Sequence, residues 1–336
     1  MSTQNPSRHP IAATITSIIV IVLVAAITLL VINRQRVIDT ISVLQFTPSS
    51  EVAAIEERME LTNEGRLHFY ATHPEVSAAE VFNTECPQRE PGSPILGCYA
   101  AGRIFIFGIT DERLDGIEEV TAAHEMLHAV WERLDQSKRD TLTQLLEAKY
   151  VTLTDPALKE RMEYYDRTQP GERVNELHSI LATEKADLGP ELEAHYATYF
   201  ENRSLVVGLY DQYNSVFTQL TTKATQVIDQ MEALSARITQ QSTEYTQASG
   251  VLSADITRFN ARANNNEFTT ATQFNNERSV LMSRSNAVDA LRAEVNQNIE
   301  TYNSLYNEYQ QISSQIEALN GSINSIQQLD EAPKVE

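Results

Sequence analysis

Two long runs of apolar residues at heptad spacing dominate the C-terminal third of the 336-residue chain. The first run extends over residues 216–259 and the second over residues 281–326. A repeat of 3.5 residues is typical of helices that pack along one seam. The runs have similar lengths, and the polar stretch 264–266 separates them. We therefore predict an antiparallel coiled-coil hairpin over residues 205–328, with its tip at about 264–274.

Parallel pairing of each run with a second copy of the chain would use the same spacing. We favour the hairpin because the connecting loop is short and the arms match in length. Two polar seam residues, Gln241 and Asn298, would then fix the register of the helices at some cost in stability. At the tip, Phe268 and Phe274 would either contact a partner or pack against each other to close the turn.

Near the N-terminus, residues 11–32 form a continuous apolar run that carries no charge. About 22 helical residues span roughly 33 Å, enough for a hydrocarbon core of about 30 Å. A cleaved signal peptide would have a shorter apolar core and a small-residue cleavage site. We therefore predict a transmembrane anchor at residues 11–33, between a short cytoplasmic N-terminus at 1–10 and a juxtamembrane segment at 34–48.

The orientation of this anchor rests on the two cysteines, because basic residues flank the apolar run on both sides. Cys86 and Cys98 close a short loop rich in Pro and Gly. This pattern favours a disulfide, which persists in oxidising compartments, over two buried free thiols. Their spacing does not fit a zinc-binding pair. We therefore predict a single-pass protein of the cell membrane with its catalytic domain outside the cytoplasm.

The balance of charge excludes one class of partner. The chain has 46 acidic and 26 basic residues, for a formal charge of −20. It contains no basic stripe that could displace counterions from a nucleic acid. We therefore expect no nucleic-acid binding.

Residues 49–204 have the pattern of an α+β domain that is mostly α. A β-branched and aromatic stretch at 103–107 predicts a strand, and a helical pattern follows from about 117 to 134. The remainder looks all-helical, and the helix that starts at Gly189-Pro190 runs on without a break into the hairpin. Residues 329–336 have the character of a disordered tail.

The helix at about 117–134 carries the motif His124-Glu125-x-x-His128. Residues four apart lie on one face of a helix, so both imidazoles can reach one ion. Glu125 lies about 100° around the helix from His124, within reach of a water on that ion. A zinc ion, Zn²⁺, lowers the pKa of such a water, and a glutamate can then act as general base.

The motif is specific. A chain of this composition would contain about 0.02 matches by chance. The alternative is a pair of surface histidines with an exposed glutamate. That alternative is disfavoured because the side of the helix that carries the histidines lies in or beside its apolar face, formed by Val120, Ala123, Leu127 and Val130.

Over residues 49–200, this motif and the order of elements resemble the zincin metallopeptidases. The resemblance implies a zinc peptidase with Glu125 as catalytic base and a strand, here 103–107, that binds substrate backbone at its edge. Zincins with a third histidine six residues beyond the second are excluded, because the chain continues AVWERLDQS. The resemblance therefore implies a third ligand from a later helix.

Three residues of that later helical half are candidates for the third ligand. Glu184 is favoured because it falls on the apolar face of its helix, where a carboxylate needs a partner. Glu176 follows Asn175, which resembles the Asn-Glu pair of thermolysin-like enzymes, although Ile180 replaces the acidic residue expected four positions later. His178 is the third option.

Zincins often use a Tyr or His to donate a hydrogen bond to the oxyanion. Candidates in the helical half are Tyr164, Tyr165, His195, Tyr196 and Tyr199. Sequence does not choose among them, and most buried tyrosines simply pack in a core.

Two functional hypotheses follow. The first is a membrane-anchored zinc metallopeptidase that hydrolyses a protein or peptide substrate, with the coiled coil as a spacer or docking arm. The alternative is an interaction module of the cell envelope in which the coiled coil binds a protein partner and the zinc site is structural or vestigial.

Overall fold

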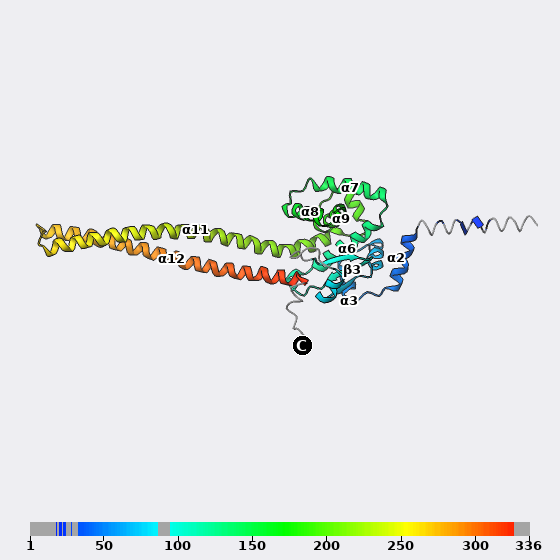
Figure 1. Ribbon diagram of the computed structural model, residues 1–336, viewed down its shortest axis with the longest axis horizontal. Coiled ribbons are helices and arrows are strands. Elements are labelled where there is room, and N and C mark those ends of the chain that lie inside the picture. Colours follow the sequence, from blue (N-terminus) through cyan, green and yellow to red (C-terminus); the bar gives the residue numbers. More distant parts are fainter. Residues whose placement is uncertain are drawn as a thin grey trace, which may run out of the picture. The chain divides into compact units, whose positions relative to one another are not determined.

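The computed structural model describes residues 33–86 and 95–325, together with Ile18, Val20, Ile21, Leu23, Val24 and Thr28. The described chain is mostly helical and contains one small sheet (Figure 1). It divides into two compact units. Unit 1 consists of residues 1–214 and 321–336, and unit 2 of residues 215–320.

The helices and strands of the first part of unit 1, in chain order, are α2 (Arg34–Gln45), α3 (Ser50–Met59), α4 (Asn63–Ala71), β1 (Glu75–Ser77), α5 (Ala79–Glu85), β2 (Gly97–Ala100), β3 (Arg103–Phe107) and the 3-10 turn η1 (Glu112–Leu114). The elements that follow are α6 (Ile117–Arg133), α7 (Gln136–Tyr150), α8 (Pro156–Thr168), α9 (Arg173–Glu184) and α10 (Pro190–Tyr196). The two long helices are α11 (Arg203–Asn264) and α12 (Ala271–Ile323).

The sheet has the order β1-β3-β2. β1 runs parallel to β3, and β2 pairs with β3 in the antiparallel direction. The strand predicted at 103–107 is therefore confirmed, but its expected place at an edge is wrong. β3 is the central strand because β1 and β2, which carry only weak strand patterns in the sequence, cover both of its sides. β2 forms the edge on the far side from β1.

The predicted single-pass membrane location is wrong as judged by the described helices. None of them is long and apolar enough to cross a membrane. α2, which falls in the expected juxtamembrane segment, has 12 residues and begins with charged side chains. The predicted cytoplasmic N-terminus at 1–10, most of the apolar run at 11–32 and the tail at 329–336 lie outside the described residues.

The helix predicted to run unbroken from residue 189 into the hairpin is in fact interrupted. α10 ends at Tyr196, and α11 begins only at Arg203. Between them, Phe200 forms an antiparallel bridge with Leu61. The buried Arg203 guanidinium donates hydrogen bonds to the backbone carbonyls of Ala182, Lys185 and Ala186, which lie near the end of α9. These long-range contacts stabilise the interruption between α10 and α11. The local spacing of apolar residues could not predict them.

Helix α6 lies at the centre of unit 1, in contact with β2, β3, α3 and α9 (Figure 1). It starts after Gly116, which has a φ of 97°. A Cβ at this position would lie 2.9 Å from the Cβ of Leu209, so glycine suits both the backbone conformation and the close packing. Glu118 and Glu119 occupy the first turn, where acidic side chains stabilise the helix by interacting with the positive end of its dipole.

Within unit 2, α11 and α12 pair in the antiparallel direction, as the hairpin hypothesis requires. Near the base, Lys223 forms an ion pair with Glu308. Near the tip, Arg262 forms an ion pair with Glu277. Between them, the side chain of Asn298 donates to that of Gln241 at 2.6 Å. The polar pair predicted to set the register therefore makes a direct contact.

The hairpin closes with an aromatic cluster. The rings of Phe268 and Phe274 lie 5.2 Å apart, and both stack near Phe259. Arg262 lies over the ring of Phe268. Of the two alternatives for the tip, the structure therefore favours rings that pack against each other.

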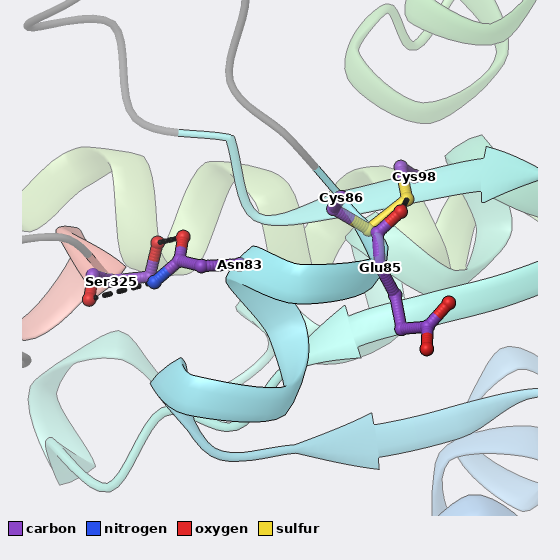
Figure 2. The surroundings of a disulfide bond; sticks show 5 residues. All are labelled: Asn83, Glu85, Cys86, Cys98 and Ser325. Atoms are coloured by element: carbon purple, nitrogen blue, oxygen red, sulfur yellow. Dashed lines mark hydrogen bonds between the residues drawn. A yellow bond between two sulfur atoms is a disulfide. The ribbon is translucent and has the colours of Figure 1, made fainter.

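Cys86 and Cys98 are joined by a disulfide that ties the end of α5 to strand β2 (Figure 2). Beside it, the side chains of Asn83 and Ser325 face each other. The Ser325 hydroxyl donates to Asn83 Oδ1 at 2.7 Å, and Asn83 Nδ2 donates to the Ser325 carbonyl at 3.1 Å. Ser325, just beyond α12, thus packs against the helix that ends next to Cys86.

Removal of the disulfide is expected to destabilise unit 1. In the variant Cys86→Ala/Cys98→Ala, the free energy of unfolding should fall by about 3 kcal/mol, the loop-entropy value for a closed loop of this size. The bridged residues are 12 apart in the chain. Denaturation of the native protein with and without reductant should give the same difference. Equal stability in both conditions would contradict it.

Candidate metal centre

The proposed site is formed by two helices, α6 and α9, which pack against each other in the core of unit 1. His124 and His128 lie one turn apart on α6, and their ring centroids are 4.7 Å apart. Glu176, in the first turn of α9, faces both rings. One ligand atom from each of the three residues lies within 4.8 Å of the other two. The predicted histidine pair is therefore brought together, with a carboxylate from a later helix.

The three ligand atoms lie close enough together to hold a metal ion. Glu176 Oε2 lies 3.5 Å from His124 Nε2 and 3.8 Å from His128 Nε2. Ligands of a tetrahedral zinc ion at bond lengths of 2.0–2.1 Å lie about 3.3–3.4 Å apart. Glu176 Oε2 is buried and has no hydrogen-bond partner in the described chain. A buried carboxylate oxygen without a partner is costly, and a cation between the two rings would satisfy it.

Asn175 orients one of the histidines. Its Nδ2 donates to Glu172 Oε2 at 2.9 Å, which leaves Oδ1 directed at His128 Nδ1, 3.0 Å away. Since an amide oxygen only accepts, His128 Nδ1 must carry the proton and Nε2 keeps its lone pair. An imidazole fixed in this way by an outer partner is typical of histidine metal ligands.

Glu125 lies next to the cluster and is 7% exposed. Strand β2 lies directly against it. A Cβ on Gly97 would lie 2.9 Å from Glu125 Cγ and 2.5 Å from a methyl group of Thr121. The backbone N–H of Tyr99 donates to the Glu125 carboxylate. The edge strand is therefore held close to the expected catalytic base, and this approach is possible only because residue 97 is a glycine.

Burial and neighbouring charges shift the pKa values of His124, Glu125 and Glu176. Burial alone would lower the pKa of His124, but the Glu176, Glu125 and Glu184 carboxylates outweigh it and the pKa is raised. Burial raises the pKa of Glu125 despite the two histidines. Burial would also raise the pKa of Glu176, but its contact with His124 lowers it overall. The surroundings of Glu176 therefore favour its ionised carboxylate over its protonated form, because the His124 ring stabilises the negative charge.

The structure places Glu176, and not the favoured Glu184, beside the two histidines. Glu184 forms a bidentate ion pair with Arg161 at 2.8 and 2.5 Å. The apolar-face argument foresaw its burial and its need of a partner, but the partner is an arginine from α8. His178 is also excluded, because its Nε2 contacts His195 Nε2 at 2.9 Å, away from the cluster.

Among the oxyanion candidates, only Tyr165 is recorded in contact with the cluster. Its hydroxyl hydrogen-bonds to Glu176, and burial raises its pKa well above the usual value. Tyr196 donates to the carbonyl of His178, while His195 and Tyr199 belong to a separate aromatic cluster. Tyr164 packs on its neighbour Tyr165 and under Arg167.

Two residues of the site, Gly97 and Tyr99, escaped the sequence analysis. Both lie on the short strand β2, directly after the Pro- and Gly-rich loop that hides its strand character. The only feature of the sequence that could have pointed to these two residues is that Cys98 lies between them. Comparisons with protein-family models, with curated proteins and with solved structures give no match.

The assignment of Glu176 predicts a selective loss of zinc. In Glu176→Gln, zinc affinity should fall by more than about 100-fold, beyond the range for loss of an outer partner. Glu184→Gln is the matched control on the same helix, since glutamine can still accept from Arg161. Competition with a chromophoric chelator measures both. If Glu184→Gln loses zinc and Glu176→Gln does not, the assignment is reversed.

Proposed function

We propose that this protein is a zinc-dependent peptidase of the zincin type. The observation that carries the proposal is the convergence of His124, His128 and Glu176 beside a buried Glu125, with a Glu176 Oε2 that has no hydrogen-bond partner among the described residues. Two histidines and a carboxylate are the ligand set of catalytic zinc sites that keep a fourth position open. A structural site would usually be closed by four protein ligands.

The order of elements supports the same proposal. A strand precedes the helix that carries the motif, and the third ligand comes from a later helix, α9. β2 runs antiparallel to β3 and pairs with no second strand among the described residues. In a strand, alternate residues direct their backbone groups to the same edge. Gly97 and Tyr99 therefore direct theirs away from β3. The Tyr99 N–H already donates to Glu125, which leaves the Gly97 groups and the Tyr99 carbonyl for an extended peptide.

Each residue then has a role in hydrolysis. A bound zinc ion would supply a Lewis acid that activates water and polarises the peptide carbonyl. Glu125 would accept the proton from the attacking water and pass it to the leaving amine. Asn175 would keep His128 in the required tautomer. The Tyr165 hydroxyl, already near the ligands, is our candidate donor to the oxyanion that develops on the carbonyl.

The substrate class follows from the edge strand. An extended backbone beside β2 would be recognised through main-chain hydrogen bonds, which depend little on side-chain identity. Gly97 lets the backbone of β2 itself lie directly against Glu125, which places the edge strand beside the proposed base. We therefore propose extended segments of polypeptide as substrates, rather than folded surfaces.

Metal removal tests the proposal. The full-length protein should cleave unfolded casein or a mixture of quenched fluorescent peptides. Cleavage should stop with 1,10-phenanthroline and return when stoichiometric zinc is added. Cleavage that persists under chelation would contradict the proposal. Bound zinc without any cleavage would instead favour the alternative, in which the metal is structural and the hairpin is the functional part.

A further inference from the structure

A groove of about 1000 Å³ lies between α11 and α12, entirely within unit 2. Its α11 wall extends over residues 228–244, where lining residues recur every three or four positions. Its α12 wall is formed by Tyr302, Tyr306 and Tyr309, which also share one face of a helix. The groove therefore runs along the helices for about 24 Å, the length of roughly 16 helical residues.

The two helices of unit 2 leave much of their apolar surface uncovered. Residues 215–320 are all described, and their buried hydrophobic side chains are few: Val227, Leu252, Ile312 and Leu319. Met231, Tyr302 and Tyr309 line the groove and remain half-exposed, and Tyr306 is 47% exposed. Tyrosine and methionine are enriched in the buried centres of protein interfaces. A third helix laid in the groove would cover these side chains.

The charge around the groove selects the partner. Residues 223–250 and 292–317 contain three basic residues, Lys223, Arg237 and Arg292, against seven acidic residues: Asp229, Glu232, Glu244, Glu294, Glu300, Glu308 and Glu317. Lys223 pairs with Glu308. Glu232 and Glu244 line the groove itself. A second copy of this acidic hairpin would bring like charges together, which opposes self-association.

We infer that this groove docks a basic amphipathic helix of about four turns from a partner protein. The apolar face of that helix would pack on Met231 and the three tyrosines. Lysine or arginine side chains on its flanks would lie beside Glu232 and Glu244. This is helix-in-groove recognition, in which apolar side chains of the bound helix, spaced three or four residues apart, pack into the groove. The inference does not depend on the zinc site, because no groove residue belongs to unit 1.

A synthetic probe tests this inference. An 18-residue peptide with leucine at the a and d heptad positions and lysine on the flanks is labelled with fluorescein. Its binding to the full-length protein is measured by anisotropy at about 150 mM salt, where only charges within about 8 Å act strongly. It should bind at least about tenfold more tightly than the same peptide with glutamate in place of lysine.

Variants locate the binding to the groove. Tyr306→Ala and Glu232→Lys should each weaken the lysine peptide by about tenfold, as expected for an anchor and a facing charge. Asp289→Lys is the control, because it makes the same change of charge at an exposed site outside the groove. Circular dichroism checks that each variant stays helical.

Three results would overturn the inference: equal binding of the two peptides, equal weakening by Asp289→Lys, or a self-associated protein that Tyr306→Ala makes monomeric. The last would identify a second copy of the chain as the occupant.

Discussion

Replacing Glu125 with glutamine is expected to lower kcat/KM for peptide hydrolysis by about 10²–10⁴-fold, the usual contribution of a general base. Glutamine keeps the shape of the side chain but cannot accept the proton of the attacking water. Glu125 is not among the three clustered ligands, so zinc content should be unchanged. Kinetics on a fluorogenic peptide, together with metal analysis of the same sample, provide the measurement.

The control for this variant is Glu132→Gln, two turns further along α6. Glu132 accepts a hydrogen bond from the Tyr99 hydroxyl, and glutamine offers an oxygen for the same contact. Activity should therefore change little in this variant. If Glu125→Gln retained full activity with zinc bound, the role of Glu125 as base would be excluded. If it lost zinc as well, the measured loss would say nothing about proton transfer.

The second large effect is expected at the buried ion pair between Asp39 of α2 and Arg133 of α6. Arg133 donates to both carboxylate oxygens at 2.9 Å, and Asp39 is 2% exposed. Asp39→Asn would leave the guanidinium buried without a counter-charge. Breaking such a pair from one side typically costs 3–5 kcal/mol, so the free energy of unfolding should fall by about that amount. Urea denaturation measures it.

An exposed ion pair serves as the matched control. Glu75 and Arg103 contact each other at 2.9 Å, with both side chains more than 40% exposed. Glu75→Gln should change stability by less than about 1 kcal/mol. The double variant Asp39→Leu/Arg133→Met should recover much of the loss, because it leaves no buried charge. If Asp39→Asn proved as mild as Glu75→Gln, the pair would not hold α2 on α6.

The hairpin and the histidine pair could be predicted because both are local patterns. A 3.5-residue repeat specifies a seam whatever the rest of the chain does, and Gln241 and Asn298 contact each other as their seam positions required. His124 and His128 share a face because helix geometry places residues i and i+4 together. Neither inference needed the tertiary structure.

The carboxylate that lies beside the two histidines could not be chosen from the sequence because it depends on the rotation of α9 against α6. Glu176 and Glu184 are both buried on the same helix, so burial alone did not separate them. Arg161, on another helix, neutralises Glu184 and leaves Glu176 for the histidines. The order of strands in the sheet could not be predicted for a related reason. β1 and β2 become strands only by pairing with β3.

Unit 1 is formed by two separate segments of the chain, which matters for the design of shortened variants. Residues 321–336 belong to the same compact unit as residues 1–214, so the hairpin is an insertion between two parts of one domain. Ser325 and Asn83, which bond across a separation of 242 residues, belong to that domain. A truncation after residue 214 would remove Ser325, whereas excision of 215–320 with a short glycine linker would spare it. The hairpin can thus be removed without deleting any residue of unit 1.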